Sequence, residues 1–337
     1  MIRCALCPHR CGIPADGSGR CKVRRNRNGS GDIPFYGHVT ALAADPIEKK
    51  TLYHVRPGSS ILSLGFAGCN LRCPFCQNWR ISQEISPESA AVPGGRTVSP
   101  AEVIAAAQAG GFRQIAYTYS EPLVHAEFLL DCMELAHSAG IANVLVSNGC
   151  VNREPAADIL ALTDAANIDL KAFSEATYSR VLGGDLAAVL AFIEAACAAG
   201  VHVEITSLIV PGLNDSAEET GRCAAFIAGL SRNIPWHLSA YHPAYRWDAP
   251  PTDKGFLIRT VLRARETLSY VYAGNLDGGA PELHDTACPA CGRTLVRRRG
   301  YRINTDGLRM QEAAGRQAYF CAHCGEAAPI VSGDVSR

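Results

Sequence analysis

No run of apolar residues in this chain approaches the about 20 residues that a membrane-spanning helix needs, and no signal-peptide pattern precedes Cys4. We therefore expect a protein without a membrane span. Fifteen cysteines in a chain without an export signal argue for metal ligation in a reducing compartment, not for disulfides. The expected location is the cytoplasm.

The chain also lacks a net charge, because 32 Lys and Arg balance 32 Asp and Glu. The charge is unevenly spread: residues 1–33 and 288–316 each carry seven basic and two acidic side chains, which leaves 18 basic and 28 acidic residues elsewhere. Contact of both segments with nucleic acid is one interpretation. We favour the other, in which their arginines offset the negative charge of a zinc–tetrathiolate centre and of the acidic remainder, since neither segment interleaves aromatic residues with its basic ones.

The composition predicts a folded chain with a large core, since 47% of the residues are hydrophobic and 19% are charged. Three parts are expected. Residues 1–33 form a Cys-rich metal-binding module, residues 34–280 form the main α/β domain, and residues 281–337 form a zinc-ribbon-like module.

The segment CNLRCPFC places Cys69, Cys73 and Cys76 three and two residues apart on one short loop. Thiolates with this spacing can ligate three irons of a 4Fe-4S cluster and leave the fourth iron without a protein ligand. An open iron can bind a substrate, so the loop indicates a reaction centre. The alternatives are a zinc site or core thiols in a chance arrangement.

Both ends of the chain carry four further cysteines. The back set, Cys288, Cys291, Cys321 and Cys324, consists of two CxxC pairs, each followed by glycine, which is typical of a zinc ribbon. The spacing of the front set, Cys4, Cys7, Cys11 and Cys21, is irregular. Zinc, a second iron–sulfur cluster and a reactive-thiol cluster remain open there, in that order of preference.

Short apolar runs alternate with helical stretches between these modules. Strands are expected at 60–68, 114–119, 142–148, 165–171, 202–210, 235–241 and 269–274, and helices at about 100–109, 123–138, 186–199 and 217–230. Capping boxes at Ser99/Glu102 and Ser216/Glu219 mark two helix starts. This alternation predicts parallel βα units, and functional residues of a βα barrel gather at the carboxyl ends of its strands.

Polar residues recur at what the pattern predicts to be those carboxyl ends. Asp169 and Lys171 alternate on one strand and therefore share a face, where each needs the other or a ligand. Glu204 and His237 are weaker candidates for lining a substrate pocket. We expect one composite site containing the cysteine loop, Glu121, Ser147, Asn148, Asp169, Lys171, Glu204 and His237.

Taken together, the chain resembles the radical S-adenosylmethionine (SAM) enzymes of the AmmeMemoRadiSam system, a branch near the pyruvate formate-lyase activating enzymes. The resemblance covers nearly the full length. It rests on the segments CALCPHRCGI, GRCKVR, DPIEKKTLYHVRPG, GCNLRCPFCQNWRIS, AYTYSEP, SNG, NIDLKAF, IVPGLND, WHLSAYHPAYR, CPACGRTLVRRRGY and CAHCG. It implies a partial (βα)6 barrel of the TIM type, and reductive cleavage of SAM at the 4Fe-4S cluster. The resulting 5′-deoxyadenosyl radical abstracts hydrogen from a substrate.

The resemblance also assigns roles in cofactor binding. Phe75 lies where the family carries an aromatic residue near the adenine of SAM. Glu121 would accept a hydrogen bond from the methionine amino group, or else stabilise a helix N-terminus. Ser147 and Asn148 would bind the carboxylate or ribose, or else only form a strand-to-helix turn. Asp169 and Lys171 would lie near cofactor and substrate, as in the activases, or else form a buried salt bridge.

Three functional classes compete. The first is a radical SAM enzyme that uses an external electron donor and acts on an unidentified substrate, with a glycyl-radical-enzyme activase acting on a partner protein as its main variant. The family name suggests small partner proteins. The second class is an RNA-binding protein whose zinc modules grip RNA and whose cluster is structural. The third, a ferredoxin-like electron carrier, needs four cysteines per cluster and is disfavoured by three.

Overall fold

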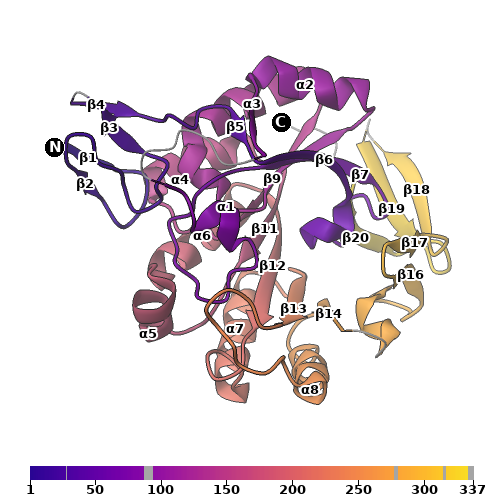
Figure 1. Ribbon diagram of the computed structural model, residues 1–337. Helices are drawn as coiled ribbons and strands as arrows, with labels where there is room; N and C mark the ends of the chain where they lie inside the picture. Colours follow the sequence, from indigo (N-terminus) through magenta and orange to yellow (C-terminus); the bar gives the residue numbers. More distant parts are fainter. Residues whose placement is uncertain (28, 87–93, 277–279, 314–315, 333–337) are drawn as a thin grey trace.

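The computed structural model describes residues 1–27, 29–86, 94–276, 280–313 and 316–332. Its centre is an eight-stranded sheet with the order β14-β13-β12-β11-β10-β9-β7-β6 (Figure 1). Neighbouring strands from β7 to β14 are parallel, and β6 pairs antiparallel with β7. The strands are β6 (Ala41–Pro46), β7 (Ser60–Gly65), β9 (Gln114–Thr118), β10 (Ala142–Ser147), β11 (Ala165–Asp169), β12 (His202–Ile209), β13 (Trp236–Ala240) and β14 (Val271–Gly274). The predicted α/β fold with a mostly parallel sheet is confirmed.

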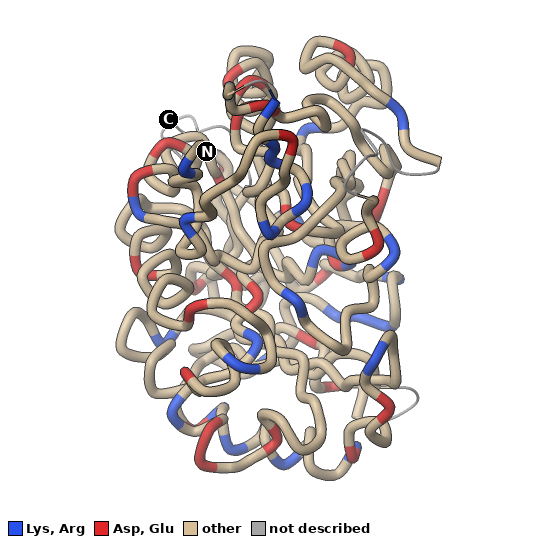
Figure 2. Tube along the Cα trace, turned by 60° about the vertical axis from the view of Figure 1, so that its left-hand side comes forward, with Lys and Arg blue, Asp and Glu red and all other residues tan. Residues whose placement is uncertain are grey.

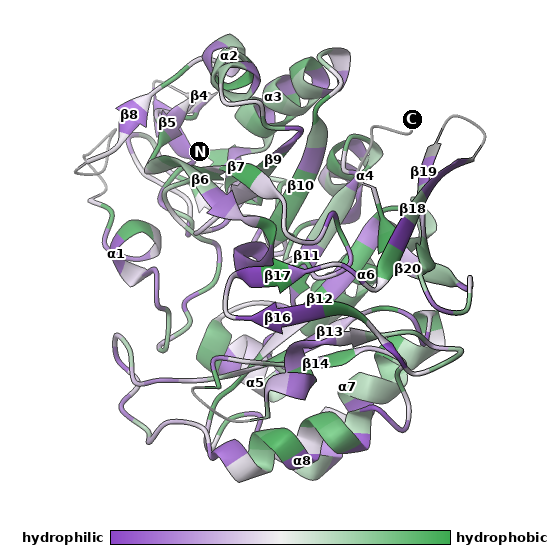
Figure 3. Ribbon diagram, turned by 90° about the vertical axis from the view of Figure 1, so that its right-hand side faces the viewer, coloured by the Kyte–Doolittle hydropathy of each residue, from purple (hydrophilic) through white to green (hydrophobic). Residues whose placement is uncertain are grey.

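Helices connect successive parallel strands and pack on one face of the sheet. Contacts of α3 with β10, of α6 with β12 and of α8 with β13 and β14 define this outer face. The helices are α1 (Trp79–Ser82), α2 (Pro100–Ala109), η2 (Pro122–His125), α3 (Ala126–Ser138), α4 (Arg153–Ala161), α5 (Glu175–Thr177), η3 (Tyr178–Leu182), α6 (Leu186–Ala198), α7 (Ala217–Leu230) and α8 (Lys254–Ala264). In Figure 3, α8 shows the alternation of hydrophobic and hydrophilic residues that a half-buried helix requires.

The helix starts follow from local chemistry. Ser99 caps α2 in a complete capping box, because its side chain accepts from the Glu102 amide while the Glu102 carboxylate accepts from the Ser99 amide. Ser216 caps α7 as predicted, but the Glu219 carboxylate instead accepts from the amide of Phe173, at 2.6 Å. In the predicted Ser216/Glu219 capping box, a tertiary contact has therefore replaced the hydrogen bond from the Ser216 amide to the Glu219 carboxylate.

The segment 47–55, which begins with η1 (Ile47–Lys50), closes the opposite, inner face of the sheet at the amino ends of the strands. Ile47, Leu52 and Val55 pack there against strand residues. The strand residues in this contact come from β7, β9, β10 and β11: Ile61, Ala116, Val144 and Ala165. These pairs sit at the amino ends of the strands, so the segment covers the end of the inner face that lies away from the cysteine loop.

Small antiparallel sheets form the two ends of the chain and flank the main sheet on opposite sides in Figure 1. The front strands are β1 (Ile2–Arg3), β2 (Gly12–Ile13), β3 (Arg25–Arg27) and β4 (Ser30–Asp32), followed by the pair β5 (His38–Val39) and β8 (Arg96–Thr97). After η4 (Pro281–His284) come β15 (Thr286–Ala287), β16 (Thr294–Arg299), β17 (Arg302–Asn304), β18 (Leu308–Ala313), β19 (Arg316–Cys321) and β20 (Ala327–Val331).

Basic and acidic side chains are interspersed along the chain (Figure 2). Several arginines of the two basic segments are paired: Arg24 with Glu127, Arg27 with Asp32, and Arg299 with Asp285. Within the described residues, no single helix is long and apolar enough to cross a membrane. Only the bent pair Glu175–Leu182 and Leu186–Ala198, with 112° between its halves, meets that test jointly, by length and composition.

Candidate functional site

The cysteine loop follows β7 directly and is held at the carboxyl edge of the sheet. Gly68 precedes Cys69 with a φ of 79°, and a Cβ there would lie 2.5 Å from the carbonyl oxygen of Cys21, so glycine is required. The His125 ring, at the start of α3, bonds the carbonyl of Ala67 at 2.7 Å. The loop thus has a backbone conformation fixed from two sides.

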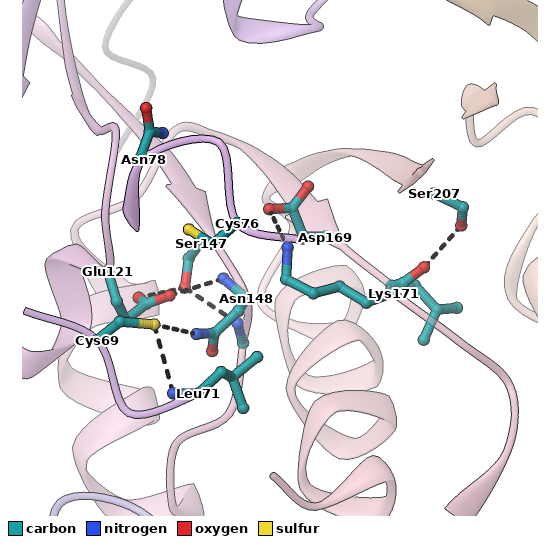
Figure 4. A network of polar contacts seen from close by, with 12 residues as sticks. Cys69, Leu71, Cys76, Asn78, Glu121, Ser147, Asn148, Asp169, Lys171 and Ser207 are labelled. Atoms are coloured by element: carbon teal, nitrogen blue, oxygen red, sulfur yellow. Dashed lines mark hydrogen bonds and ion pairs between the residues drawn. The ribbon is translucent and has the colours of Figure 1, made fainter. Parts of the chain in front are cut away.

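The predicted cofactor-binding residues Glu121, Ser147 and Asn148 meet beside Cys69 (Figure 4). The Glu121 carboxylate accepts from the Ser147 hydroxyl at 2.7 Å and from the amides of Asn148 and Leu123 at 2.8 and 3.0 Å. The side-chain amide of Asn148 donates to the Cys69 sulfur at 3.6 Å. Residues from three neighbouring strand ends therefore form one polar group at the cysteine loop.

Asn70, which the sequence reasoning passed over, completes this group. Its side-chain oxygen accepts from Asn148 at 3.0 Å, and its amide donates to the carbonyl of Cys150 at 2.6 Å. It is 2% exposed. A buried asparagine between two cysteines of a metal motif was the signal available in the sequence.

The donor set fits a cluster held by three thiolates. The Cys69 sulfur accepts from the Leu71 amide at 3.3 Å as well as from Asn148, and the Cys76 sulfur lies 3.2 Å from the Ser82 hydroxyl. Burial, and then the neighbouring Glu121 and Cys73 charges, raise the pKa of Cys69 well above its usual value; burial also raises that of Cys73 to about 11. Such thiols become thiolates only beside a compensating cation, which iron provides.

Phe75 is 4% exposed and packs in the main hydrophobic core together with Cys73. Its predicted place near the adenine stays a prediction.

Asp169 and Lys171 lie at the end of β11 and just beyond it, as predicted, and form an ion pair of 3.0 Å (Figure 4). Their side chains are 34% and 20% exposed, so neither is sealed in the core. Burial opposes the charge of Lys171, but the charges of Asp169 and Cys73 outweigh it and raise the pKa of Lys171. Asn214, in the turn that follows β12, donates to the Lys171 carbonyl at 2.8 Å and thereby holds this strand end.

The predicted position of Glu204 and His237 at the carboxyl strand ends is wrong. Glu204 is the third residue of β12 and His237 the second of β13, so both lie near the amino ends of their strands. The Glu204 carboxylate contacts the His237 and His202 rings at 2.6 and 3.2 Å and accepts from the amides of His54 and Tyr53 at 2.7 and 3.0 Å. Its oxygens are used in fastening the segment 47–55 to the sheet.

A second polar cluster, which the sequence reasoning missed, lies at the edge strand β6. Asp45 accepts from Lys49 and Lys50 at 2.7 Å each and from the Tyr119 hydroxyl at 2.5 Å. Lys50 is 2% exposed and its ammonium lies 4.3 Å from the centre of the Tyr119 ring. Tyr119, two residues before Glu121, has a φ of 73°, so this cluster fixes a strained backbone next to the site.

The back cysteines are brought together as predicted. The sulfurs of Cys288 and Cys324 are 3.6 Å apart, those of Cys291 and Cys321 are 3.7 Å apart, and all four lie within 4.8 Å of one another. A tetrahedral zinc with bonds of about 2.3 Å requires sulfurs separated by about 3.8 Å. A cluster of four cysteines with the dimensions of a zinc site is therefore present.

The front cysteines are placed together by β1 and β2. The Cys4 amide donates to the Cys11 carbonyl at 3.0 Å, and the amide of Arg20, beside Cys21, donates to the Cys11 sulfur at 3.4 Å. Charge from Cys21, Cys4 and Cys11 adds to burial in raising the pKa of Cys7 to about 11.

Comparison with known proteins relates this architecture to a family. Residues 64–224 match the model of the Radical SAM superfamily. An uncharacterised protein of Methanocaldococcus jannaschii is 38% identical over 98% of this chain and 96% of its own length. The pyruvate formate-lyase-activating enzyme of Clostridium pasteurianum is 28% identical over 52% of this chain and 73% of its own length. The structure of SuiB of Streptococcus suis bound to S-adenosylmethionine aligns with a TM-score of 0.49 at 14% identity, over 64% of this chain and 52% of that one.

Proposed function

We propose that this chain, which belongs to the radical SAM superfamily and is related to glycyl-radical-enzyme activases, holds a 4Fe-4S cluster on Cys69, Cys73 and Cys76 and cleaves S-adenosylmethionine reductively. The observation that carries the proposal is the convergence of Glu121, Ser147 and Asn148 on Cys69. When bound, the cluster and SAM supply one-electron chemistry that yields methionine and, after hydrogen abstraction from a substrate, 5′-deoxyadenosine.

The residues around the loop have separate tasks in this proposal. Glu121 offers an acceptor to the methionine amino group. The Ser147 hydroxyl and the Asn148 backbone amide hold the Glu121 carboxylate in one orientation. The Asn148 side chain donates to the Cys69 sulfur and so ties the acceptor to the metal ligand. Phe75 supports the loop from the core.

Asp169 and Lys171 are our candidates for the substrate side. They remain partly exposed, and a charged pair at a strand end beside Cys73 can orient a polar substrate or accept and hold a proton. Asp169 and Lys171 thus make the region beside the cysteine loop, at the carboxyl ends of the strands, polar. The amino ends of the strands are closed by Glu204 and the segment 47–55.

Four finer assignments belong to the same proposal. The main sheet would curl into the partial (βα)6 barrel of the radical SAM type. Zinc would occupy the cluster of the four back cysteines, as their sulfur spacings of 3.6 and 3.7 Å support. An external one-electron donor would reduce the cluster, and small partner proteins of the AmmeMemoRadiSam system would accompany the enzyme.

The decisive experiment measures 5′-deoxyadenosine formed by anaerobically reconstituted protein with dithionite and SAM. We expect product from the native chain and from Cys197→Ala, a control cysteine in α6, and none from Cys69→Ala/Cys73→Ala/Cys76→Ala. No product from protein that carries a full, reducible cluster would refute the proposal and favour a binding protein with a structural cluster.

Activation of a glycyl-radical enzyme is the second candidate, favoured by the similarity to the Clostridium pasteurianum activating enzyme. Anaerobic incubation with purified pyruvate formate-lyase, followed by electron paramagnetic resonance, tests it. A glycyl-radical signal that requires Cys69, Cys73 and Cys76 would support the activase, and deoxyadenosine without that signal would reject it for this partner.

A further inference from the structure

Tyr119 has a backbone conformation that glycine adopts freely and tyrosine does not. Its φ is 73°, in the left-handed region where a side chain costs free energy that other contacts must offset. Tyr119 comes two residues before Glu121, so its conformation sets the direction in which the chain delivers the Glu121 carboxylate to the cysteine loop. The contacts that hold Tyr119 in this conformation therefore bear on the cofactor site.

The turn at Tyr119 is bonded at three points to the segment that carries the cysteines. The bonds run from the Ser120 hydroxyl to the Phe66 carbonyl at 2.7 Å, from the Glu121 amide to the Gly68 carbonyl at 3.3 Å, and from the Asn78 side-chain amide to the Tyr119 carbonyl at 2.5 Å. These partners flank the cysteines on both sides along the chain. A rotation of the Tyr119 backbone would therefore move Glu121 relative to the cysteines.

The ring of Tyr119 lies over a glycine on the inner face of the sheet. A Cβ at Gly65 would lie 2.7 Å from the ring, so a side chain at the end of β7 would exclude the tyrosine. Gly65 shares the inner face with Ile61, four residues earlier on the same strand. Asp45, which accepts from the phenol, pairs with Ile61 across the strands. The Tyr119 side chain thus points back along the sheet, from the carboxyl end of β7 toward its amino end.

A buried ion pair anchors the phenol at its far end. The Tyr119 hydroxyl donates to the Asp45 carboxylate at 2.5 Å, and this carboxylate also accepts from Lys50 at 2.7 Å. Asp45 is 7% exposed and Lys50 is 2% exposed, and the Lys50 ammonium lies 4.3 Å from the centre of the Tyr119 ring. A hydrogen bond to an ionised carboxylate is stronger than one between neutral groups, and the cation over the ring adds a further attraction. Both contacts hold the side chain in the position that the positive φ gives it.

We propose that Asp45 and Lys50 are positioning residues for SAM binding, which they affect through Tyr119 and Glu121. The ion pair holds Tyr119 in the conformation that places Glu121 at the cysteine loop. This inference rests on the proposed function, because it concerns SAM bound beside Glu121. It makes Tyr119 replaceable by glycine, which needs no anchor at this φ, but not by alanine.

The first test compares two substitutions that remove the same contacts. Tyr119→Ala and Tyr119→Gly both remove the ring and the phenol, but only glycine adopts a φ of 73° without strain. We expect anaerobically reconstituted Tyr119→Ala to bind SAM about tenfold more weakly than Tyr119→Gly, measured by calorimetry at matched iron content. If the ring acted by contacting SAM, the two variants would lose the same affinity.

The second test removes the anchor. Asp45→Leu/Lys50→Met replaces both members of the ion pair, so that neither charge is left buried alone. With Tyr119 in place we expect about tenfold weaker SAM binding, and in the Tyr119→Gly background no further loss. Tyr36→Phe is the matched control, because it removes a tyrosine–aspartate hydrogen bond to Asp131 of α3, and it should bind SAM like the native chain.

Equal SAM affinities of Tyr119→Ala and Tyr119→Gly, or an equal loss from Asp45→Leu/Lys50→Met in both backgrounds, would overturn the inference. The proposed function would survive either result if the native protein binds SAM and forms 5′-deoxyadenosine. Native protein that holds a full, reducible cluster and binds no SAM would instead refute the proposed function, and this inference with it. Circular dichroism checks that each variant is folded, and if Tyr119→Ala is not, the second test decides alone.

Discussion

Glu121 is the residue on which the cofactor site depends most. It is 1% exposed and its carboxylate already accepts three hydrogen bonds. Burial outweighs these bonds and raises its pKa to about 7. A carboxylate poised near neutrality, beside the thiols that we propose bind the cluster, ties ligand binding to its protonation state.

Replacing Glu121 with glutamine should weaken SAM binding by roughly tenfold to a hundredfold, the value of a charged hydrogen bond of about 1.5–3 kcal/mol. In the native protein the affinity should fall from pH 8 to pH 6, because the carboxyl becomes protonated below pH 7 and then loses its charge as an acceptor. Calorimetry at matched iron content measures both effects.

Glu134→Gln, on the exposed side of α3, is the matched control and should bind like the native protein. If Glu121→Gln kept the native affinity and pH dependence, Glu121 would be a helix-capping residue only, consistent with its bond to the Leu123 amide.

At the level of elements, the segment 47–55 closes one end of the inner face through a buried histidine. The His54 side chain is 0% exposed, and its ring nitrogens bond the Pro329 carbonyl at 2.7 Å and the Tyr272 hydroxyl at 2.6 Å. A carbonyl accepts only, so Nδ1 carries the proton and Nε2 accepts from Tyr272. The neutral ring satisfies both partners.

Acid should therefore destabilise this element. Burial lowers the pKa of His54 from 6.5 to about 3, so the native state resists protonation that the unfolded state accepts. The contribution is complete above pH 6.5 and decreases as the pH falls toward 3, by about 2 kcal/mol at pH 5.

Urea unfolding at pH 7.5 and pH 5 measures this contribution. The loss of stability between the two pH values should be about 2 kcal/mol smaller in His54→Gln than in the native chain. His242→Gln, at an exposed position, should lose as much as the native chain. An equal loss in His54→Gln would show that His54 is accessible to protons in the folded state.

The strands and the cysteine loop could be predicted from the sequence because their signals are local. Apolar runs located all seven parallel strands, and the convergence of Glu121, Ser147 and Asn148 followed from the rule that parallel strands end at one edge. Glu204 and His237 were misplaced because they were grouped with the other polar strand residues, although the predicted strands 202–210 and 235–241 already place both near the amino end, where the structure has them.

The Asp45–Lys50–Tyr119 cluster was missed for a different reason. Its members are separated by 74 residues along the chain and meet only because β6 runs antiparallel at the edge of the sheet. A single sequence contains no signal for such a pairing. A charged segment such as DPIEKK is as typical of an exposed turn as of a buried ion-pair cluster.

On the scale of the whole molecule, the back module closes the amino end of the main sheet. Arg298, 2% exposed, donates to the Tyr53 carbonyl at 2.6 Å and to the Thr286 hydroxyl at 2.8 Å. The Val331 amide donates to the His54 carbonyl at 2.8 Å. The module that carries the four back cysteines therefore also supports the segment 47–55.

Disrupting the four back cysteines, which we propose bind zinc, should loosen both regions together. In Cys291→Ser/Cys324→Ser, whose altered positions are exposed, we expect amide hydrogen exchange to rise at least tenfold in β16 and β19 and in residues 51–58, equivalent to about 1.4 kcal/mol of local stability. β10 and β11 should keep their protection, because their partners are other strands of the main sheet.

Cys197→Ser should exchange like the native chain. Unchanged protection in β16 and in residues 51–58 of zinc-free protein would mean that side chains such as Arg298 hold the module without metal.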